Sequence, residues 1–470
     1  MFLHLTRSLV LGALIAPFSL AAQASDTLRL SLADAVTRAV RESDEIKIAA
    51  AQIDVAEAQV TSARASALPA LQFTGGYTQV EKNARATIVN PTIFGQSYTY
   101  TTNFNLSQPL FQGGRIFAAS RAANDVRRAA RYDLDETRAL VSVSIQRAYL
   151  QVLLNQQLAD IQANNLRLAE ERLALVQRLE GAGRAARFDV LRARVEKTNL
   201  EPGLTQAQNN VELALIELRR LLNIPLARPV VLTSELDTAA VRQLARSIRA
   251  DSSRPPVRAS LRAAQSTLDA RHEGVRVARA DFLPTVNLFF RTGFLALPQT
   301  SGFPTRWGNT SNANCPPGSD STRLCQNNGW YPDRSLGLQV SWALFDGLRA
   351  KGNMNLAQAQ ERVARTQLEQ ERENVAVEQA RAAAEFERAE RTYEAQRQNA
   401  EEAEEAFRIA SLRFERGLGT QLEVTDAQFA LLTARSNAAR GTVDYYLAAA
   451  ELARARGASV PLPPTRTISR

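Results

Sequence analysis

The stretch Pro109-Leu-Phe-Gln-Gly-Gly-Arg115 occurs a second time, with few changes, as Ala343-Leu-Phe-Asp-Gly-Leu-Arg349. The repetition extends well beyond this motif, because the block 111–223 recurs at one constant shift as the block 345–457. A repeat of this length is one large supersecondary unit used twice, rather than a solenoid of short repeats. The sequence therefore predicts two similar halves, and any function must come from an object with internal pseudo-symmetry.

Each half is predicted to run helix, strand, strand, very long helix, turn and helix. The first helix is expected over 31–67, where Ser31-Leu-Ala-Asp34 resembles a capping box. The very long helices are expected over 115–180 and 353–416, where neither Gly nor Pro interrupts the sequence. Each would extend roughly 100 Å, since a helix rises about 1.5 Å per residue. Helices of this length must pair along their sides, as coiled coils or as the staves of a tube.

Each long helix is expected to reverse at a glycine-containing turn, with Gly181 and Gly183 in the first half and Gly417 and Gly419 in the second. Gly readily adopts the left-handed backbone conformation that is common at the residue ending a helix. The long helix and the helix that follows it should therefore form a hairpin with a tight tip. An apolar stripe on the first long helix predicts packing against a partner helix: Leu150, Leu153, Leu154, Leu158 and Ile161.

Two segments in each half alternate between apolar and polar residues, which predicts strands. Such alternation is typical of membrane β-barrel strands, and a half-buried soluble sheet produces it equally. Aromatic residues toward the strand ends favour the membrane. Four strands cannot close a barrel alone, because single-chain barrels begin at about eight strands and lipid tolerates no open edge. Several copies are required, and three would supply twelve strands. The apolar positions are Leu71, Phe73, Tyr77; Tyr98, Tyr100, Phe104, Leu106; Val286, Leu288, Phe290, Phe294; and Leu336, Leu338, Val340, Trp342.

Residues 1–24 are predicted to be a signal peptide, because Arg7 precedes an apolar run and Ala22-Gln-Ala24 forms a small-x-small cleavage site. The mature chain then starts at Ser25 and is exported. Beyond this segment no uncharged apolar stretch reaches the length of about 18 residues that a membrane-spanning helix needs. The predicted organisation is a first repeat over 25–228, a second repeat over 229–457 and a flexible tail over 458–470.

Composition excludes several classes of function. The 470-residue chain has a net charge of +9, but its basic residues alternate with acids along the helices, as in Arg167-Leu-Ala-Glu-Glu-Arg172. Nucleic-acid binding is therefore not expected. Outside the signal peptide the sole histidine is His272, predicted to be a surface residue. This lack of histidine removes His-based triads and most transition-metal sites, and no enzyme activity, catalytic residue, cofactor or metal is expected.

The two cysteines, Cys315 and Cys325, lie in an insertion rich in Pro, Gly and Asn between the strands of the second half. In an exported protein they are expected to form a disulfide with each other. Outer-membrane barrels have short periplasmic turns and long outer loops. The insertion is therefore expected to face the cell exterior.

Taken in order, these motifs resemble the TolC-type outer-membrane channel family over essentially the whole mature chain. The resemblance is carried by the doubled architecture, by Leu68-Pro69 and Leu283-Pro284 before the first strands, and by the motif that opens each long helix. The segments after the tips, 183–193 and 413–427, complete it. The first tip departs from the family pattern, with Ala186 where the second half has Thr420.

The resemblance implies a mixed α/β membrane protein that assembles as a homotrimer. A twelve-stranded barrel in the outer membrane would continue as a long α-helical barrel across the periplasm. The resemblance further implies the exit duct of a tripartite efflux pump, which exports small molecules passively, or of a type I protein secretion system. Its partners would be outer-membrane lipid, an inner-membrane pump that supplies energy, and a periplasmic adaptor that grips the tip.

A duct performs no bond chemistry, so its functional residues should line a gate or a docking surface. Asp189 follows the first tip, and Glu423 and Asp426 follow the second, three residues apart on one helix face. In a trimer each would form a ring of carboxylates that attracts cations at a constriction. Asp189 and Glu423 also lie near helix N-termini, where carboxylates are favoured without any gate. Asp426 lies too deep for a cap, which favours it as the gate residue.

Two further alternatives remain open at this stage. The glycines of the tips resemble the adaptor-docking surface of the family, but they are equally explained by backbone geometry. A soluble periplasmic adaptor would also have coiled-coil hairpins, although without the doubled pattern. The resemblance favours a channel in the outer membrane that extends into the periplasm.

Overall fold

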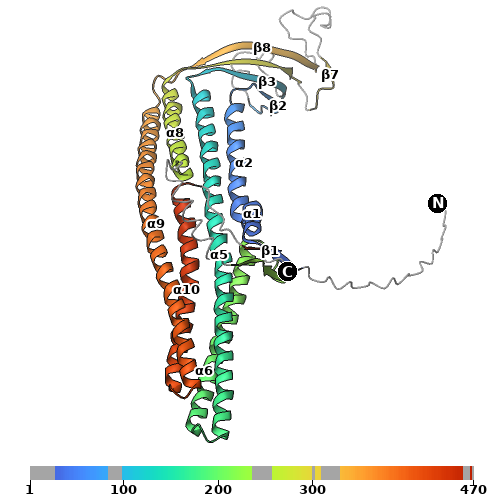
Figure 1. Cartoon of the computed structure of the whole chain (residues 1–470). Helices are drawn as coiled ribbons and strands as arrows, with labels where there is room; N and C mark the ends of the chain where they lie inside the picture. The colour runs from blue at the N-terminus through green and yellow to red at the C-terminus, as the bar shows by residue number, and fades with distance from the viewer. Residues whose placement is uncertain are drawn as a thin grey trace, which may run out of the picture.

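The computed structural model describes residues 27–82, 98–235, 257–298, 302–307, 329–458 and 466–467. The predicted signal peptide, the predicted disulfide between Cys315 and Cys325 and most of the predicted tail lie outside these residues. The described chain is elongated, with the long strands at one end and the tips of two helical hairpins at the other (Figure 1).

The predicted order of elements is confirmed in both halves. The first half contains α1 (Leu32–Glu42), α2 (Asp44–Ala65), β2 (Ala70–Gln79), β3 (Tyr98–Gln112), α5 (Arg115–Gly181) and α6 (Arg187–Leu221). The second contains α8 (Ala259–Arg279), the 3-10 helix η1 (Ala280–Phe282), β6 (Thr285–Ala296), β7 (Arg306–Trp307), β8 (Gly329–Ser341), α9 (Arg349–Glu415) and α10 (Gln421–Ala455). Helices α5 and α9 have 67 residues each, and α6 and α10 have 35 each. The two helices of the hairpin therefore have the same lengths in both halves.

The prediction of one unbroken first helix over 31–67 is wrong at Ser43. The capping box at Ser31 is present, but Ser43 takes an extended conformation that separates α1 from α2. The Asn223 side chain, just beyond α6, donates to the Glu42 carbonyl at 2.9 Å and to the Asp44 carboxylate at 2.8 Å. The Ser43 hydroxyl accepts from the Ile46 N–H at 3.4 Å and caps α2. The break is therefore held by a residue that is distant in the sequence.

Helix α9 begins earlier than predicted, at Arg349 instead of residue 353. Gly347 and Leu348 have φ of +70° and +70°, so the chain turns sharply before the helix. The Asp346 carboxylate then accepts from the Ala350 N–H at 2.7 Å, which satisfies a donor of the first turn.

The long strands form one sheet in the order β2-β3-β6-β8-β7, in which β2, β3, β6 and β8 are antiparallel. Strand β7 pairs only with Gly329 and Trp330 of β8. Strand β2 is exposed at every residue, and it forms one edge of the sheet. Apart from the short contact with β7, β8 forms the opposite edge.

Two short pairs of strands were not predicted: β1 (Leu28–Leu30) with β4 (Val230–Leu232), and β5 (Ser234–Glu235) with β9 (Arg466–Thr467). The core of the molecule lies beside the first pair, at mid-length of α5. Tyr149 is fully buried there and donates its hydroxyl to the Leu30 carbonyl at 2.9 Å. The predicted stripe on α5 packs into this core, with Leu150, Leu153 and Leu154 buried.

The helices form a single row (Figure 1). Helix α5 packs against α2 and α8 on the side toward the sheet and against α6 and α10 on the side toward the tips. Helix α9 packs against α8 and α10. On the side toward the sheet the row therefore ends with α2 at one side and with α9 at the other.

Candidate functional site

Both hairpin tips have the predicted glycine geometry. Gly183 and Gly417 have φ of +72° and +73° and follow α5 and α9. At the first tip the Gly183 N–H donates to the Glu180 carbonyl at 2.8 Å, and the N–H of the next residue reaches the Leu179 carbonyl at 2.8 Å. The second tip repeats both bonds, so each helix ends in a Schellman motif. A Cβ at Gly181, Gly183 or Gly417 would meet no atom within 4 Å, which leaves these tips smooth.

The three acidic candidates have different surroundings. The Asp189 carboxylate accepts from the Ala186 N–H at 3.1 Å, a capping interaction at the start of α6. Glu423 donates its N–H to the Thr420 hydroxyl at 3.3 Å, and its carboxylate lies 3.9 Å from Arg413. Asp426 is exposed one turn further along α10, and its carboxylate has no hydrogen-bond or ion-pair partner among the described residues.

A buried polar network near these acids was not predicted. Arg172 of α5 has a side chain only 7% exposed and donates to Glu196 of α6 at 2.8 Å. The same guanidinium donates to Thr425 of α10 at 3.0 Å and to the Gln428 side chain of α10. Gln428 donates in turn to the Asn165 carbonyl at 3.2 Å. The network joins α10 to α5 and α6, and Thr425 and Gln428 lie about one to two turns from the start of α10, whereas Arg172 lies about two and a half turns before the end of α5. Burial lowers the pKa of Arg172, and Glu196 opposes this shift.

The sequence contained a signal for this network. Asn165, Ala169, Arg172 and Val176 follow one another at spacings of three and four residues, and all four are buried on one stripe of α5. From the sequence, Arg172 was cited only as an example of a basic residue interspersed with acids, and the burial of its side chain was not predicted. Its position on the stripe shows that it belongs to the helix interface.

A second ionic cluster lies where α8 begins. Arg258, which occupies the N-cap of α8, is 8% exposed and donates to Glu136 of α5 at 2.7 Å and to Glu378 of α9. Arg454 of α10 donates to Glu378 and lies 3.6 Å from Glu136. Burial opposes ionisation of Glu378, but hydrogen bonds from Arg258 and Arg454 lower its pKa overall. The cluster ties α5, α8, α9 and α10 together at mid-length.

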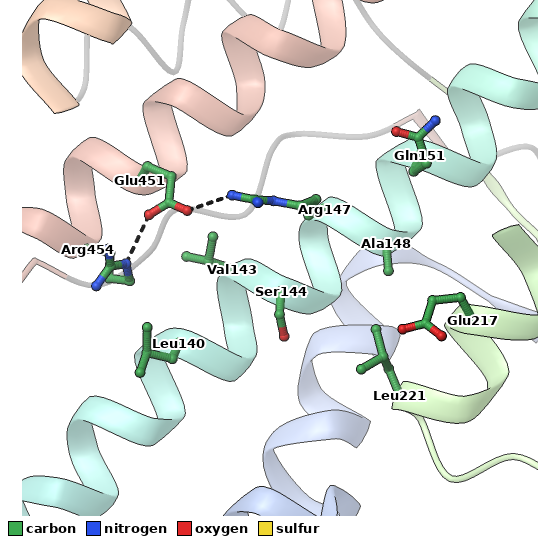
Figure 2. A pocket seen from close by; sticks show the side chains of 10 residues that line it. All are labelled: Leu140, Val143, Ser144, Arg147, Ala148, Gln151, Glu217, Leu221, Glu451 and Arg454. Atoms are coloured by element: carbon green, nitrogen blue, oxygen red, sulfur yellow. Dashed lines mark hydrogen bonds and ion pairs between the residues drawn. The ribbon is translucent and has the colours of Figure 1, made fainter. Parts of the chain in front are cut away.

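A pocket of about 530 Å³ lies on α5 beside this cluster (Figure 2). Its ionic groups neutralise one another, since Glu451 accepts from Arg147 at 2.8 Å and from Arg454 at 3.0 Å. The pocket contains none of the predicted site residues. It is lined by Leu140, Val143, Ser144, Arg147, Ala148, Gln151, Glu217, Leu221, Glu451 and Arg454.

The described residues contain no group of three or more His, Cys, Asp or Glu side chains that could hold a metal ion. No helix in the described ranges is long and apolar enough to cross a membrane. His272 lies at the surface as predicted, with its side chain 54% exposed and 3.3 Å from Glu361.

Comparison with known proteins places these features in a family. The family model described as "Outer membrane efflux protein" matches residues 35–223 and 257–458. The pyoverdine export outer membrane protein OpmQ of Pseudomonas aeruginosa is 25% identical over 423 residues, which cover 85% of this chain and 79% of that protein. The proteases secretion protein PrtF of Dickeya chrysanthemi is 26% identical over 214 residues, 44% of this chain and 46% of its own length.

Solved structures share the fold. The outer membrane protein VceC of Vibrio cholerae superposes with a TM-score of 0.70 at 20% identity, covering 92% of this chain and 97% of that chain. The CmeC outer membrane channel of Campylobacter jejuni gives a TM-score of 0.71 at 17% identity, covering 91% and 85%. The predicted two-repeat α/β architecture is thus confirmed.

Proposed function

Because this chain belongs to the outer membrane efflux protein family, we propose that it is the exit duct of a tripartite efflux pump, which small molecules cross passively. The family places the chain in the outer membrane, with its helices extending into the periplasm. The family assignment excludes a soluble adaptor, and the chain is a channel component rather than an enzyme.

The match to OpmQ over 85% of the chain is the observation that carries the efflux function, because the name of that relative states pyoverdine export. A second candidate is the outer-membrane channel of a type I secretion system. It is favoured by PrtF, whose name states protease secretion, although that match covers only 44% of this chain. Deletion of the gene, followed by measurement of small-molecule accumulation and of secreted protein, distinguishes the two functions.

The proposal includes assembly into a homotrimer. In lipid every backbone N–H and C=O must be paired, so the two sheet edges, β2 and β8, need partners. The four long strands of one chain are too few, because barrels begin at about eight strands. The resemblance to TolC-type channels favours three copies, and hence twelve strands continued by a helical barrel. An adaptor would hold the smooth tips at Gly181, Gly183, Gly417 and Gly419, and an inner-membrane pump would supply energy.

We expect the mature protein to be recovered from the outer-membrane fraction and to have the mass of three chains in detergent. The reason is that unpaired strand edges cannot remain in lipid. Native mass spectrometry in detergent measures the number of chains. A soluble monomer recovered without detergent would contradict both the location and the assembly.

The gate is proposed to be a ring of Asp426 side chains. Asp426→Asn should reduce the cation preference of the channel and weaken block by multivalent cations, because the substitution removes one charge per chain from a constriction. Glu423→Gln should act mainly on stability, by about 1 kcal/mol or less, because Glu423 lies in the first turn of α10 beside Thr420. Planar-bilayer recordings on both variants measure these effects. Unchanged selectivity in assembled Asp426→Asn would leave Asp426 as an ordinary solvated residue.

A further inference from the structure

The pocket on α5 is walled by equivalent parts of the two repeats (Figure 2). Glu217 near the end of α6 corresponds to Glu451 near the end of α10 at the constant shift between the repeats. Glu217 accepts from Arg220 at 2.7 Å, and Glu451 accepts from the equivalent Arg454 at 3.0 Å. Helix α5 packs against both α6 and α10 and forms the floor of the pocket. Floor and walls therefore come from one chain, and the pocket does not depend on a second copy.

The floor is apolar in the first repeat and polar at the equivalent face of the second. Leu140 of α5 lines the pocket and is 47% exposed. The equivalent face of α9 has Asn374 in place of Leu140 and Glu378 in place of Ser144. Glu378 is bound there by the guanidinium of Arg258. The two repeats therefore differ at this face, and the first one carries the apolar surface.

The polar groups around this floor already bind one another. The lining carries two arginines and two glutamates, so its charges sum to zero, and each of these side chains has an ion-pair partner. The Ser144 hydroxyl donates to the Val141 carbonyl at 2.9 Å, and the Gln151 amide donates to the Asn155 side chain at 3.0 Å. A charged ligand would lose hydration here without finding an unpaired counter-charge. An uncharged ligand that covers the apolar floor gains the hydrophobic contribution without that cost.

The pocket lies on the face of α5 opposite to the short strands. Tyr149 faces β1 and β5, since its hydroxyl donates to the Leu30 carbonyl at 2.9 Å and accepts from the Ser234 N–H at 3.3 Å. Arg147 and Gln151 each lie two residues from Tyr149, which places them about 200° around the helix. A duct needs a clear lumen, so the face of the row that carries the short strands should face the periplasm. The pocket then opens toward the lumen.

We propose that this pocket binds uncharged, largely apolar small molecules as they pass through the duct. Its volume of about 530 Å³ falls within the range of about 300–1,000 Å³ that is typical of small-molecule sites. The proposal rests on the proposed efflux function. It adds the chemical class of the cargo and the surface that the cargo contacts, which is formed by Leu140, Ser144 and Ala148 of α5.

Photolabelling of the channel in outer-membrane vesicles tests the pocket. The probe is 3-trifluoromethyl-3-phenyldiazirine, which is uncharged and apolar and reacts with nearby groups on illumination. Trypsin releases the floor of the pocket as the peptide 139–147, and it releases the peptide 122–127 from the same helix. Val126 in the second peptide is 40% exposed and lies about five turns before Ser144, on the same face of α5. Label in 139–147 should saturate with probe concentration and exceed label in 122–127 by about ten-fold.

Three variants make the labelling specific. Leu140→Asn introduces the residue of the second repeat and should raise the half-saturating probe concentration for peptide 139–147 by about ten-fold. Ser144→Trp fills the pocket from an exposed position and should reduce its label to the level of peptide 122–127. Val126→Asn is the matched control and should leave the labelling of 139–147 unchanged. Label that does not saturate, or that neither pocket variant reduces, would overturn the site.

Competition tests the chemical class of the ligand. Benzyl alcohol in excess should displace the probe from the pocket, because it is uncharged and its ring can cover the apolar floor. Benzoate and benzylammonium have the same ring with a full charge, and they should displace the probe about ten-fold less effectively. Equal competition by either ion would overturn the preference for uncharged molecules.

Planar-bilayer recordings separate this inference from the proposed function. After Cys315→Ser and Cys325→Ser remove the native cysteines, Ser144→Cys is modified with a bulky charged thiol reagent. The single-channel conductance should change, because the pocket opens toward the lumen. Complete modification without a change in conductance would place the pocket outside the lumen and overturn its contact with cargo. Absence of any conductance in the native protein, with the pocket still labelled, would instead overturn the proposed duct.

Discussion

Replacing Arg258 with alanine should lower the free energy of unfolding by about 1–3 kcal/mol, because it removes one of the two guanidinium groups that face Glu136 and Glu378 and leaves only Arg454 beside them. The Arg258 side chain is 8% exposed, and Glu136 beside it is 15% exposed. The guanidinium also reaches Glu378, so it joins α5 and α9 at the start of α8. Chemical denaturation followed by far-UV circular dichroism, at fixed protein and detergent concentrations, measures the change.

Arg279→Ala is the matched control, since Arg279 is an exposed arginine at the other end of α8. Its substitution should change stability by about 0.5 kcal/mol or less. If Arg258→Ala were no more destabilising than this control, the cluster would contribute nothing to the fold.

The pH dependence of stability provides a second measurement of the same cluster. The pKa of Glu378 is lowered overall, because hydrogen bonds from Arg258 and Arg454 outweigh burial. A carboxyl with a lowered pKa stabilises the fold above its unfolded pKa, near about 4.3, and this stabilisation is lost as the pH falls through the folded pKa. Arg258→Ala should therefore lose less stability than the native chain on acidification through that range. A parallel loss in both proteins would contradict the assignment.

Most of the fold could be predicted because its largest elements have strong local patterns. Helix α5 spans 67 residues with no Gly or Pro before its last residue, so its extent follows from composition. The glycines at 183 and 417 then end α5 and α9 by backbone geometry. The break at Ser43 could not be predicted, because the bonds that hold it come from Asn223, far away in the sequence.

The short strands β1 and β4 escaped prediction for a different reason. Each has three residues, too few to show an alternation of apolar and polar side chains. The two strands pair with each other although most of the first half separates them in the sequence. Their position depends on the burial of Tyr149, which anchors the Leu30 carbonyl. Tertiary contacts of this kind leave no local trace in the sequence.

The sequence identified the positions of the acidic candidate residues, but it predicted the contacts of their side chains only in part. A capping role had been weighed for Asp189, and its bond to the Ala186 N–H has that geometry. For Asp426, spacing identified an uncapped position, and its carboxylate is exposed in the described chain. The burial of Arg172 was not predicted, because the charges around it in the sequence alternate in sign and do not distinguish a buried arginine from an exposed one. Burial of a charged side chain depends on its partners, and Glu196 and Gln428 come from other helices.

The second large effect that we expect is a loss of stability when the network around Arg172 is disrupted. Arg172→Met removes a charge that is 7% exposed and leaves Glu196, itself 19% exposed, without its partner. The expected loss of stability is about 3–5 kcal/mol. Adding Glu196→Gln removes the uncompensated carboxylate and should recover part of this loss, a coupling that the double-mutant cycle measures. Denaturation of the native chain, the two single variants and the double variant gives the four corners of the cycle.

The same variants test whether Arg172 only holds α10 against α5 and α6 or also keeps the proposed gate closed. Among the described residues, the side-chain hydrogen bonds that join the tip-side half of α10 to α5 and α6 run through Thr425 and Gln428, and Arg172 donates to both. Asp426 lies between these two residues in the sequence, so release of α10 would move the proposed acidic ring. The Arg172→Met/Glu196→Gln protein should therefore be more stable than Arg172→Met and still conduct more than the native channel in planar bilayers. A double variant with native conductance would show that Arg172 holds the helices together without holding the gate closed.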